Sequence, residues 1–489
     1  MAKGDIVVGL DIGTTKVCTL VAEVTGDDGR VDVLGVGVAP SAGLRRGVVV
    51  DIDQTIRAVE ESREKAQRMA GVEIHSVVVG VTGEHIASVN SRGVIAITHA
   101  DRQVTHEDVE RVMENARVIV LPPDREIVHA IPRGYALDGQ NGIRSPVGMS
   151  GTRLEVETHI VTGATSFLRN VAVCVERAGL GIEDVVLEPI ATAEAVLLPA
   201  ERDLGVALVD IGGGTSDLAI FVGGDVAYSA VVPVGGGYVT RDLAAGLRAS
   251  MEEAERVKLT YGTALVPPAP RPRRDDSGLE DAAAAAGSDE LAEPTFIYTP
   301  LGDAEPVERP VRILAEIIEP RMSELFHLVR QEINRSNYGH LLPAGLVLSG
   351  GGAMLAGARE LAAEITGLPV RVGCPSGIGG LSESVNAPSY STAVGLVQWG
   401  GASSRGRRAA RPRGWHRGDP ALDAPRDPRG NRRMTSELSA IPAGKRRFGR
   451  GIVPGDRMFG SLSGIIRHYL PGKHLPVLFP IPTQHHRGR

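Results

Sequence analysis

The chain has 489 residues, of which 42% are hydrophobic and 23% charged, a balance typical of a soluble protein of about three domains. Its net charge of −6 combines an acidic body, −20 over residues 1–400, with a basic arm from Gly401 onward that carries 19 Lys and Arg against five Asp and Glu. No segment is long and apolar enough to span a membrane, and acidic residues interrupt the N-terminus where a secretory signal would lie. We therefore expect a cytosolic or peripheral chain, and three widely spaced cysteines, expected to be buried, exclude a disulfide framework or a zinc site.

The first part of the chain alternates strands and helices. Apolar periodicity predicts two strands around a Gly-Thr-Thr turn over 5–24, a helix at 52–70 and a strand at 74–81. It then predicts helices at 106–120 and 166–178 and a strand at 184–188. The helix at 106–120 lies in a turn-rich stretch, 84–161, which indicates a compact α+β insert. Thr105 and Asp108 predict a capping box at the start of that helix.

The second part begins in the same way. The pattern predicts a strand, a Gly-rich turn and a strand over 204–222, then a long helix at 240–260 and a helix at 311–334. A strand at 345–349 and helices at 355–365 and 391–399 follow. Between them, residues 263–310 contain eight prolines and several acidic residues, which predicts a disordered loop around one or two short strands. Residues 401–456 are rich in Arg, Pro and Gly and are also predicted to be disordered.

Two glycine-rich turns carry the main chemical signal. Asp11-Ile12-Gly13-Thr14-Thr15-Lys16 and Asp210-Ile211-Gly212-Gly213-Gly214-Thr215 each follow an apolar strand, and their aspartates are 199 residues apart. Glycine lets backbone N–H groups approach a phosphate closely, and an aspartate before each turn can hold a hydrated magnesium ion. Either turn alone would be an ordinary hairpin. Two of them predict a pair that clamps a polyphosphate from both sides.

Three weaker motifs accompany the turns. Gly350-Gly351-Gly352-Ala353-Met354 follows a strand at the predicted start of a helix, where a phosphate could bind. Glu255 and Lys258 share a helix face and could reach a ribose or base edge. Glu188, at the predicted end of a strand, could orient or deprotonate a water. Each also has an ordinary structural interpretation, as a turn, an exposed ion pair and a strand end respectively.

Taken in chain order, the five segments resemble the nucleotide cleft of the actin, sugar kinase and DnaK-type chaperone superfamily, with a closing helix at 388–399. Within it the chain resembles the FtsA family of bacterial cell-division proteins, on the position of the insert and on Asn90-Ser91-Arg92-Gly93, the 121–132 segment and residues 146–154. The resemblance spans residues 5–400, apart from 263–310.

The resemblance implies an α/β protein with an actin-like (ribonuclease H-like) two-lobed ATPase fold, an α+β insert subdomain and a disordered basic C-terminal tail. The implied first lobe has its core at 1–83 and 162–190, with the insert at 84–161 and a closing helix at 386–400. The implied second lobe has its core at 191–232 and 319–385, with an outer subdomain at 233–318. An Arg-rich linker at 401–456, an amphipathic membrane helix at 457–471 and a tail at 472–489 follow.

The resemblance also implies ATP and Mg²⁺ as cofactors, slow or no hydrolysis, and a nucleotide that switches filament formation. Asp11 and Asp210 would hold Mg²⁺ through water, and Glu188 would be the catalytic, water-positioning residue. The residues implied to contact the nucleotide are Gly13, Thr14, Thr15, Lys16, Gly212, Gly213, Gly214, Thr215, Glu255, Lys258, Gly350, Gly351, Gly352 and Met354.

The implied partners are those of the division machinery. The C-terminal peptide of the tubulin-like protein FtsZ would dock on the helices at 240–262 and 311–338, with Arg321, Arg330 and Asn334 as candidate contacts. The insert would serve self-association into filaments and contacts with later divisome membrane proteins. Together these contacts would tether the Z ring to the cytoplasmic face of the membrane at the division septum.

An amphipathic membrane helix is the implied anchor. The apolar residues of 457–471 fall on one helical stripe, namely Met458, Phe459, Leu462, Ile465, Ile466, Tyr469 and Leu470. The basic arm would add attraction to an anionic membrane surface. Binding of nucleic acid is disfavoured, because only Trp415 and Phe448 interleave the arginines and could stack on bases.

Three other functions use the same superfamily fold. A sugar or acetate kinase would need a catalytic aspartate and sugar-binding residues between its lobes, and the insert offers no such constellation. A chaperone would need a substrate-binding β-domain, for which the 89-residue basic tail is unsuited. A pilus-assembly relative stays open as an alternative, because only its partner would distinguish it.

Overall fold

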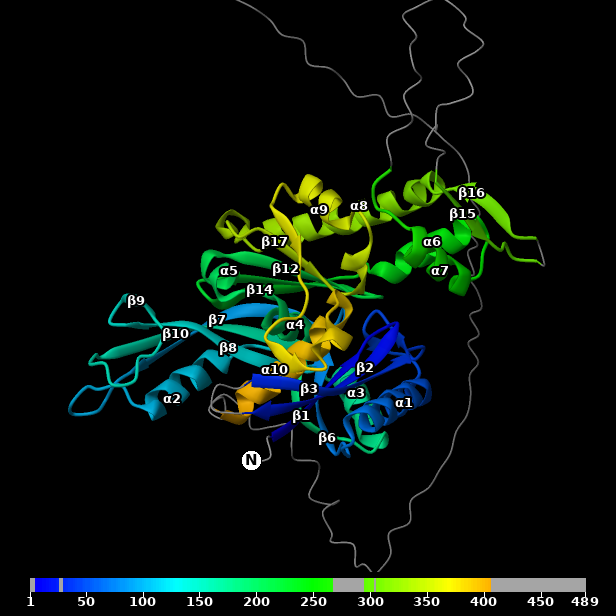
Figure 1. Cartoon of the computed structure of the whole chain (residues 1–489). Coiled ribbons are helices and arrows are strands. Elements are labelled where there is room, and N and C mark those ends of the chain that lie inside the picture. The colour runs from blue at the N-terminus through cyan, green and yellow to red at the C-terminus, as the bar shows by residue number, and fades with distance from the viewer. Residues whose placement is uncertain (1–4, 26–29, 267–293, 303–304, 406–489) are drawn as a thin grey trace, which may run out of the picture. The chain divides into compact units, whose positions relative to one another are not determined.

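The structure, a computed structural model, describes residues 5–25, 30–266, 294–302 and 305–405 (Figure 1). The predicted membrane helix, the tail and nearly all of the Arg-rich linker lie outside the described residues, as does the middle of the 263–310 loop. None of the described helices is long and apolar enough to cross a membrane.

The first lobe is built on a six-stranded sheet with the order β11-β6-β1-β2-β3-β19. Its strands are β1 (Asp5–Ile12), β2 (Lys16–Thr25), β3 (Arg30–Pro40), β6 (Ser76–Val81), β11 (Gly181–Leu187) and β19 (Ile378–Gly380). The first three pair as an antiparallel meander, and β6 and β11 add on in parallel. Helices α1 (Ile52–Ala70) and α3 (Thr165–Arg177) pack together over one face, around a buried Val, Ile and Leu core.

The second lobe repeats this topology. Its sheet has the order β14-β13-β12-β17-β18, again an antiparallel meander extended by two parallel strands. The strands are β12 (Val206–Ile211), β13 (Ser216–Val222), β14 (Asp225–Val232), β17 (Leu346–Ser349) and β18 (Val370–Val372). Helices α6 (Gly236–Leu247), α7 (Met251–Tyr261), α8 (Arg312–Arg335) and α9 (Ala358–Thr366) share a core with it. The repeated motif in the sequence is therefore a repeated fold.

Two helices, α4 (Glu188–Val196) and α10 (Ser391–Arg405), lie between the two sheets and share one core with both (Figure 1). They pack closely, because a Cβ at Gly395 would collide with the carbonyl of Ala191. Helix α10 runs to Arg405, past the predicted end at residue 399. Gly400 and Gly401 do not stop the helix, since their bare backbone fits against Val7 and Val24 of the first sheet.

The insert, cyan in Figure 1, has a four-stranded antiparallel sheet with the order β7-β10-β8-β9 and its own core. Its elements are β7 (Ala87–Ala96), α2 (His106–Arg117), β8 (Arg125–Leu137), β9 (Gln140–Ile143) and β10 (Arg153–Ala164). The capping box is confirmed: Thr105 Oγ1 accepts from Asp108 N at 3.2 Å, and Asp108 Oδ2 accepts from Thr105 N at 3.0 Å. The prediction of a compact α+β insert is also confirmed.

Short elements complete the fold. They are β4 (Leu44–Arg45), β5 (Val48–Val49), α5 (Pro199–Leu204), β15 (Thr295–Tyr298), β16 (Val307–Pro310) and the 3₁₀ turns η1 (Gly339–Leu341), η2 (Gly351–Met354), η3 (Ser382–Val385) and η4 (Pro388–Tyr390). Strands β15 and β16 pair with each other, so the short strands expected in the proline-rich loop are present.

Predictions about two helices and one cysteine are wrong. The single helix at 240–260 is two helices, because Arg248 adopts a left-handed conformation (φ 53°) and Ser250 caps α7 by accepting from Glu253 N at 3.1 Å. Helix α9 begins at Ala358, three residues later than expected, because η2 intervenes. Cys18 and Cys174 are buried as expected, but Cys374 is exposed, since it lies in the loop that follows β18.

Candidate functional site

The two glycine-rich turns, called here the paired turns (Gly13–Lys16 and Gly212–Thr215), have the same geometry. Gly13 N donates to Lys16 O, and Gly212 N donates to Thr215 O, each at 2.9 Å. The turns lie against each other, because a Cβ at Gly213 would be 2.8 Å from Thr15 Oγ1 and a Cβ at Gly214 would be 2.6 Å from Thr14 Oγ1. The structure therefore brings the two predicted turns together, with glycines in one facing threonines in the other.

Four buried carboxylates, called here the carboxylate cluster, lie beneath the turns: Asp11, Glu188, Asp210 and Asp217. Burial raises the pKa of Asp11 to about 6. The positive charge of Lys16 lowers this pKa in part, and the negative charge of Asp210 raises it further. Burial also raises the pKa of Glu188 well above its usual value, and the three aspartates add to the rise. A buried group of like charges is unfavourable unless a cation joins it, so the cluster suits a bound cation.

Asp210, at the end of β12, is held by the two helices between the lobes. Its Oδ2 accepts from Thr192 Oγ1 of α4 at 2.6 Å and from Thr392 Oγ1 of α10 at 2.9 Å. Burial raises the pKa of Asp210, and these two hydrogen bonds oppose the rise. We did not predict either threonine from the sequence, although a threonine inside the alanine-rich run of α4 is a usable signal of a buried polar partner.

Asp217 was also missed. It pairs with Asp210 across the β12–β13 hairpin, in the place that Cys18 takes opposite Asp11 in the first lobe. Thr82, at the end of β6, donates to Asp217 Oδ1, so the contact joins the two lobes. Burial raises the pKa of Asp217 to about 7. Its position was a usable signal, because Asp217 follows Asp210 by seven residues and residues so spaced around such a turn face each other.

The donor set fits a magnesium ion held through water. Asp11 and Asp210 offer hard carboxylate oxygens, one from each lobe. In the part of the chain that the structure describes, no three or more His, Cys, Asp or Glu side chains are arranged to hold a metal directly. Mg²⁺ usually keeps several of its waters and takes one or two carboxylates, so Asp11 and Asp210 stay the predicted ligands.

Glu188 begins helix α4 instead of ending a strand, because β11 stops at Leu187 and Pro189 favours the first helical turn. Gly80 leaves room for it: a Cβ there would be 3.1 Å from Glu188 Cγ. Lys16 Nζ donates to the carbonyl of Ser389 and lies 4.4 Å from the centre of the Tyr390 ring. Both predicted residues thus lie at the turns and the carboxylate cluster.

The third glycine motif adjoins Asp210. Gly350 has φ 79°, and a side chain there would collide with the Asp210 carboxylate. Gly352 lies equally close to Ile211. However, Gly351 to Met354 form the 3₁₀ turn η2 and not the first turn of an α-helix, so the expected helix N-terminus is wrong. Met354 is exposed.

Glu255 and Lys258 form an ion pair of 2.7 Å on α7. Thr240 Oγ1 donates to Glu255 Oε2 at 2.5 Å and accepts from Lys258 Nζ at 2.9 Å. The start of α6 connects this pair to the second turn, because Gly236 N donates to Gly212 O at 2.9 Å. The pair is therefore connected to the paired turns, and its implied contact with adenosine stays a prediction.

The three candidate contacts for a partner peptide do not share a surface. Arg321 is bound within the second lobe, to Asp242 at 2.6 Å. Arg330 lies nine residues further along α8, which places it about 180° around the helix, and it donates to the carbonyl of Ile365 at 3.2 Å. Asn334 follows one turn later on the same side as Arg330.

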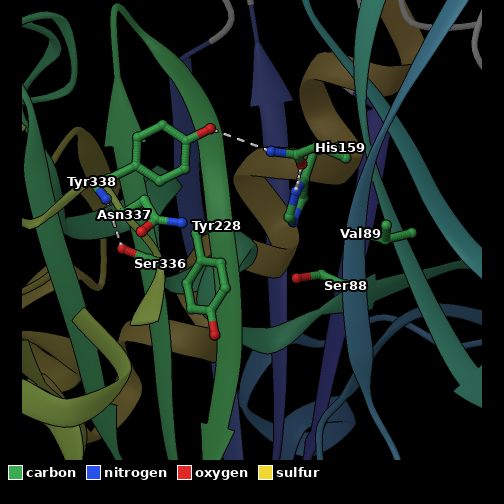
Figure 2. A pocket seen from close by; sticks show the side chains of 8 residues that line it. Ser88, Val89, His159, Tyr228, Ser336, Asn337 and Tyr338 are labelled. Atoms are coloured by element: carbon green, nitrogen blue, oxygen red, sulfur yellow. Dashed lines mark hydrogen bonds between the residues drawn. The ribbon is translucent and has the colours of Figure 1, made fainter. Parts of the chain in front are cut away.

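A separate pocket of about 400 Å³, called here the insert pocket, contains none of the predicted residues. Its lining comes from the insert and the second lobe (Figure 2): Ser88, Val89, Asn90, His159, Tyr228, Ser336, Asn337 and Tyr338. His159 Nδ1 pairs with Asn90 Oδ1 at 2.7 Å, and its Nε2 pairs with Ser229 Oγ at 3.0 Å. These groups already bind one another, which indicates a structural contact.

Comparisons with known proteins place the chain among its relatives. Residues 83–162 match the family model described as "SHS2 domain inserted in FTSA", and residues 207–395 match "Cell division protein FtsA". The chain is 45% identical over 398 residues to the cell division protein FtsA of Pseudomonas aeruginosa, covering 81% of this chain and 90% of that one. It is 41% identical over 389 residues to that of Neisseria meningitidis serogroup B, covering 79% and 88%.

Among solved structures, the "PilM-PilN type IV pilus biogenesis complex" is similar with a TM-score of 0.56 and 18% identity, covering 83% of this chain and 99% of that one. At this identity the likeness concerns the fold alone. The fold of this chain is that of the actin-like ATPases, which the duplicated sheets and the helices between them already indicated.

Proposed function

The chain belongs to the FtsA family of cell-division proteins, and from this premise we propose that it is an ATP-binding adaptor. It polymerises at the cytoplasmic membrane, binds the C-terminal peptide of FtsZ and tethers the Z ring at the septum, where it recruits later divisome proteins. The observation that carries the proposal is the pair of facing turns above buried carboxylates from both lobes, in a chain whose insert matches the one in this family.

ATP and Mg²⁺ would bind at the paired turns. Asp11 and Asp210 would hold the cation through water, and the cation supplies charge compensation for the phosphates. The backbone N–H groups of both turns would donate to phosphate oxygens, and Lys16 would exchange the Ser389 carbonyl for one of them. Gly350 to Met354, Glu255 and Lys258 would form the adenosine side.

Glu188 would orient a water toward the terminal phosphate. Burial and the neighbouring aspartates raise the pKa of Glu188 well above its usual value, which favours the protonated carboxyl, and a protonated carboxyl is a poor base. This supports slow hydrolysis and a nucleotide that acts as a switch for filament formation more than as a fuel.

The FtsZ peptide would dock on the outer part of the second lobe. Apolar side chains are exposed there on α7 and around β15, with Leu259 74% and Ile297 56% exposed. Peptide grooves commonly use such apolar anchors within a polar rim. Of the candidate contacts, Arg330 and Asn334 would act together, and Arg321 would act from the other side of α8.

The insert would carry self-association and the contacts with later divisome proteins. The loop after α2 supports this role, because Val118 and Val120 are exposed on it, and exposed apolar patches mark interaction sites. Membrane binding would come from residues 457–471 and the basic arm, on the evidence of the sequence pattern.

Co-sedimentation with anionic liposomes tests the adaptor function. Purified FtsZ is spun with liposomes and either the full-length chain or the chain cut after Gly455, each with and without ATP. We expect FtsZ in the pellet only with the full-length chain, and more of it with ATP. Leu462→Glu, on the apolar stripe, should abolish the effect, whereas the matched change Leu438→Glu in the linker should preserve it. If the full-length chain leaves FtsZ in solution, the adaptor function fails.

A further inference from the structure

The hairpin formed by β4 and β5 has an unusual residue at its tip. Leu44 pairs with Val49 and Arg45 with Val48, so the turn consists of Arg46 and Gly47 alone. Both have positive φ, 53° and 74°, the geometry of a two-residue type I′ turn, whose first position favours Asn, Asp or Gly. An arginine in this left-handed conformation is disfavoured relative to those residues.

The backbone of this tip lies against both paired turns. Gly47 N donates to Thr14 Oγ1 of the first turn at 3.2 Å. On the other side, a Cβ at Gly214 of the second turn would be 3.0 Å from the Arg46 Cα. The tip therefore contacts both lobes at the place where the phosphates are proposed to bind.

The side chain of Arg46 reaches the second lobe. Its Nε donates to the hydroxyl of Tyr238, and its guanidinium lies 5.6 Å from the centre of that ring. Tyr238 is in the first turn of α6, where the N–H groups of Gly236 and Gly237 donate to the carbonyls of Gly212 and Gly213. The hydrogen bond thus joins the first lobe to the start of α6, which holds the second of the paired turns.

The two ends of this contact are each held by further partners. Arg46 Nη1 pairs with Glu84 at 2.8 Å. The Tyr238 ring packs under Arg241 and Arg321 of the second lobe, at 5.1 and 5.6 Å, and Arg321 is itself paired with Asp242. Separating the lobes would break a charged hydrogen bond and a cation–π contact between two preorganised groups.

We propose that Arg46 and Tyr238 form a latch between the lobes that slows release of the nucleotide. The latch rests on the proposed nucleotide binding, because it controls how often the paired turns separate. It gives the arginine at the turn a role: a residue better suited to the backbone conformation would lack this bond between the lobes. Retention of ATP in a filament subunit would then depend on a contact outside the phosphate turns.

Nucleotide release tests the latch. The full-length chain is loaded with a fluorescent ATP analogue and Mg²⁺, and the analogue is chased with excess ATP in a stopped-flow instrument. Tyr238→Phe should accelerate release about tenfold, because the free energy of a hydrogen bond to a charged group corresponds to a change of about that size. Tyr228→Phe is the matched control, because that hydroxyl donates to Glu332 within the second lobe, and its release rate should be that of the unmodified chain.

Arg46→Asn separates the latch from simple loss of stability. Asparagine tolerates positive φ, so the thermal midpoint of the free chain should be kept or raised. Release should be accelerated at least as much as in Tyr238→Phe, and adding Tyr238→Phe to Arg46→Asn should accelerate it no further. Equal release rates for Tyr238→Phe and Tyr228→Phe would overturn the latch. If the unmodified chain binds no nucleotide, the proposed function fails instead. A double-mutant cycle of Arg46→Asn and Tyr238→Phe on urea unfolding then decides the latch, and zero coupling refutes it.

Discussion

The carboxylate cluster and the insert pocket both contain polar side chains at a junction between parts of the molecule, and they are built in opposite ways. In the cluster, burial and neighbouring carboxylates raise the pKa of Asp11 and of Glu188, and only Asp11 has an opposing contribution, from Lys16. In the insert pocket, His159 has a neutral partner on each ring nitrogen. Satisfied neutral groups stabilise a junction, whereas buried like charges cost stability and persist where a ligand uses them.

The difference separates a site of binding from a site of attachment. Substitutions in the cluster should therefore change ligand affinity more than stability, and substitutions at the insert pocket should do the reverse. Four experiments can break or sharpen this contrast.

Asp210→Asn should have the largest effect. It removes the charge that a cation needs, while Thr192 and Thr392 can still donate to the remaining amide oxygen. We expect the Mg²⁺-dependent affinity for ATP to fall roughly 10- to 100-fold, with no loss in the free energy of unfolding. Calorimetric titration with and without Mg²⁺, beside urea unfolding, checks both values. An affinity equal to that of the unmodified chain would contradict the cation site.

Gly213→Ala should weaken nucleotide binding roughly tenfold, because the new methyl group meets Thr15 and forces the paired turns apart. Gly134→Ala is the matched control, since a Cβ at that position has open space around it and its φ is not positive. Adding Thr15→Gly to Gly213→Ala should restore part of the affinity. If the single variant binds ATP normally, the turns do not face each other as described.

The paired turns could be predicted from the sequence, because their signal is local and occurs twice: an apolar strand, Asp-Ile-Gly and a second strand. The helix at 52–70 and the capping box of α2 were equally local. The partners of the turns could not be predicted in this way. Thr192 and Thr392 meet at Asp210 only because α4 and α10 pack between two sheets, and no spacing along the chain indicates that meeting.

The errors have a physical cause as well. The apolar pattern of the second lobe continues through Arg248, so periodicity alone cannot detect that the backbone turns left-handed there and that Ser250 starts a new helix. The glycines at 350–352 predicted the start of a helix, although their role is to let their own backbone approach Asp210 and Ile211. Arg46 carried no signal at all, since its importance comes from a contact 192 residues away in sequence.

His159→Ala tests the insert pocket. It leaves Asn90 and Ser229 without their ring-nitrogen partners, so we expect the free energy of unfolding to fall by roughly 1 kcal/mol and the affinity for ATP to stay unchanged. His75→Ala, at an exposed histidine, is the control and should alter neither. A loss of ATP affinity in His159→Ala would remove the contrast between the two regions.

The smallest effect is a difference in pH dependence. Burial lowers the pKa of His159 to about 3, below its ordinary 6.5, and raises that of Asp217 to about 7, above its ordinary 3.8. Between pH 7 and pH 5 the unfolded chain binds a proton at His159 and the folded chain does not, so acidification costs stability there. At Asp217 the folded chain binds the proton and the unfolded chain does not, so acidification adds stability.

The two variants should therefore change the pH profile in opposite directions. On going from pH 7 to pH 5, His159→Asn should lose less stability than the unmodified chain, because the destabilising histidine is gone. Asp217→Asn should lose more, because the stabilising proton uptake is gone. Urea midpoints of the three proteins at both pH values measure the slopes. Parallel profiles would mean that burial does not shift these two groups in opposite directions, and that the cluster and the pocket differ less than their contacts indicate.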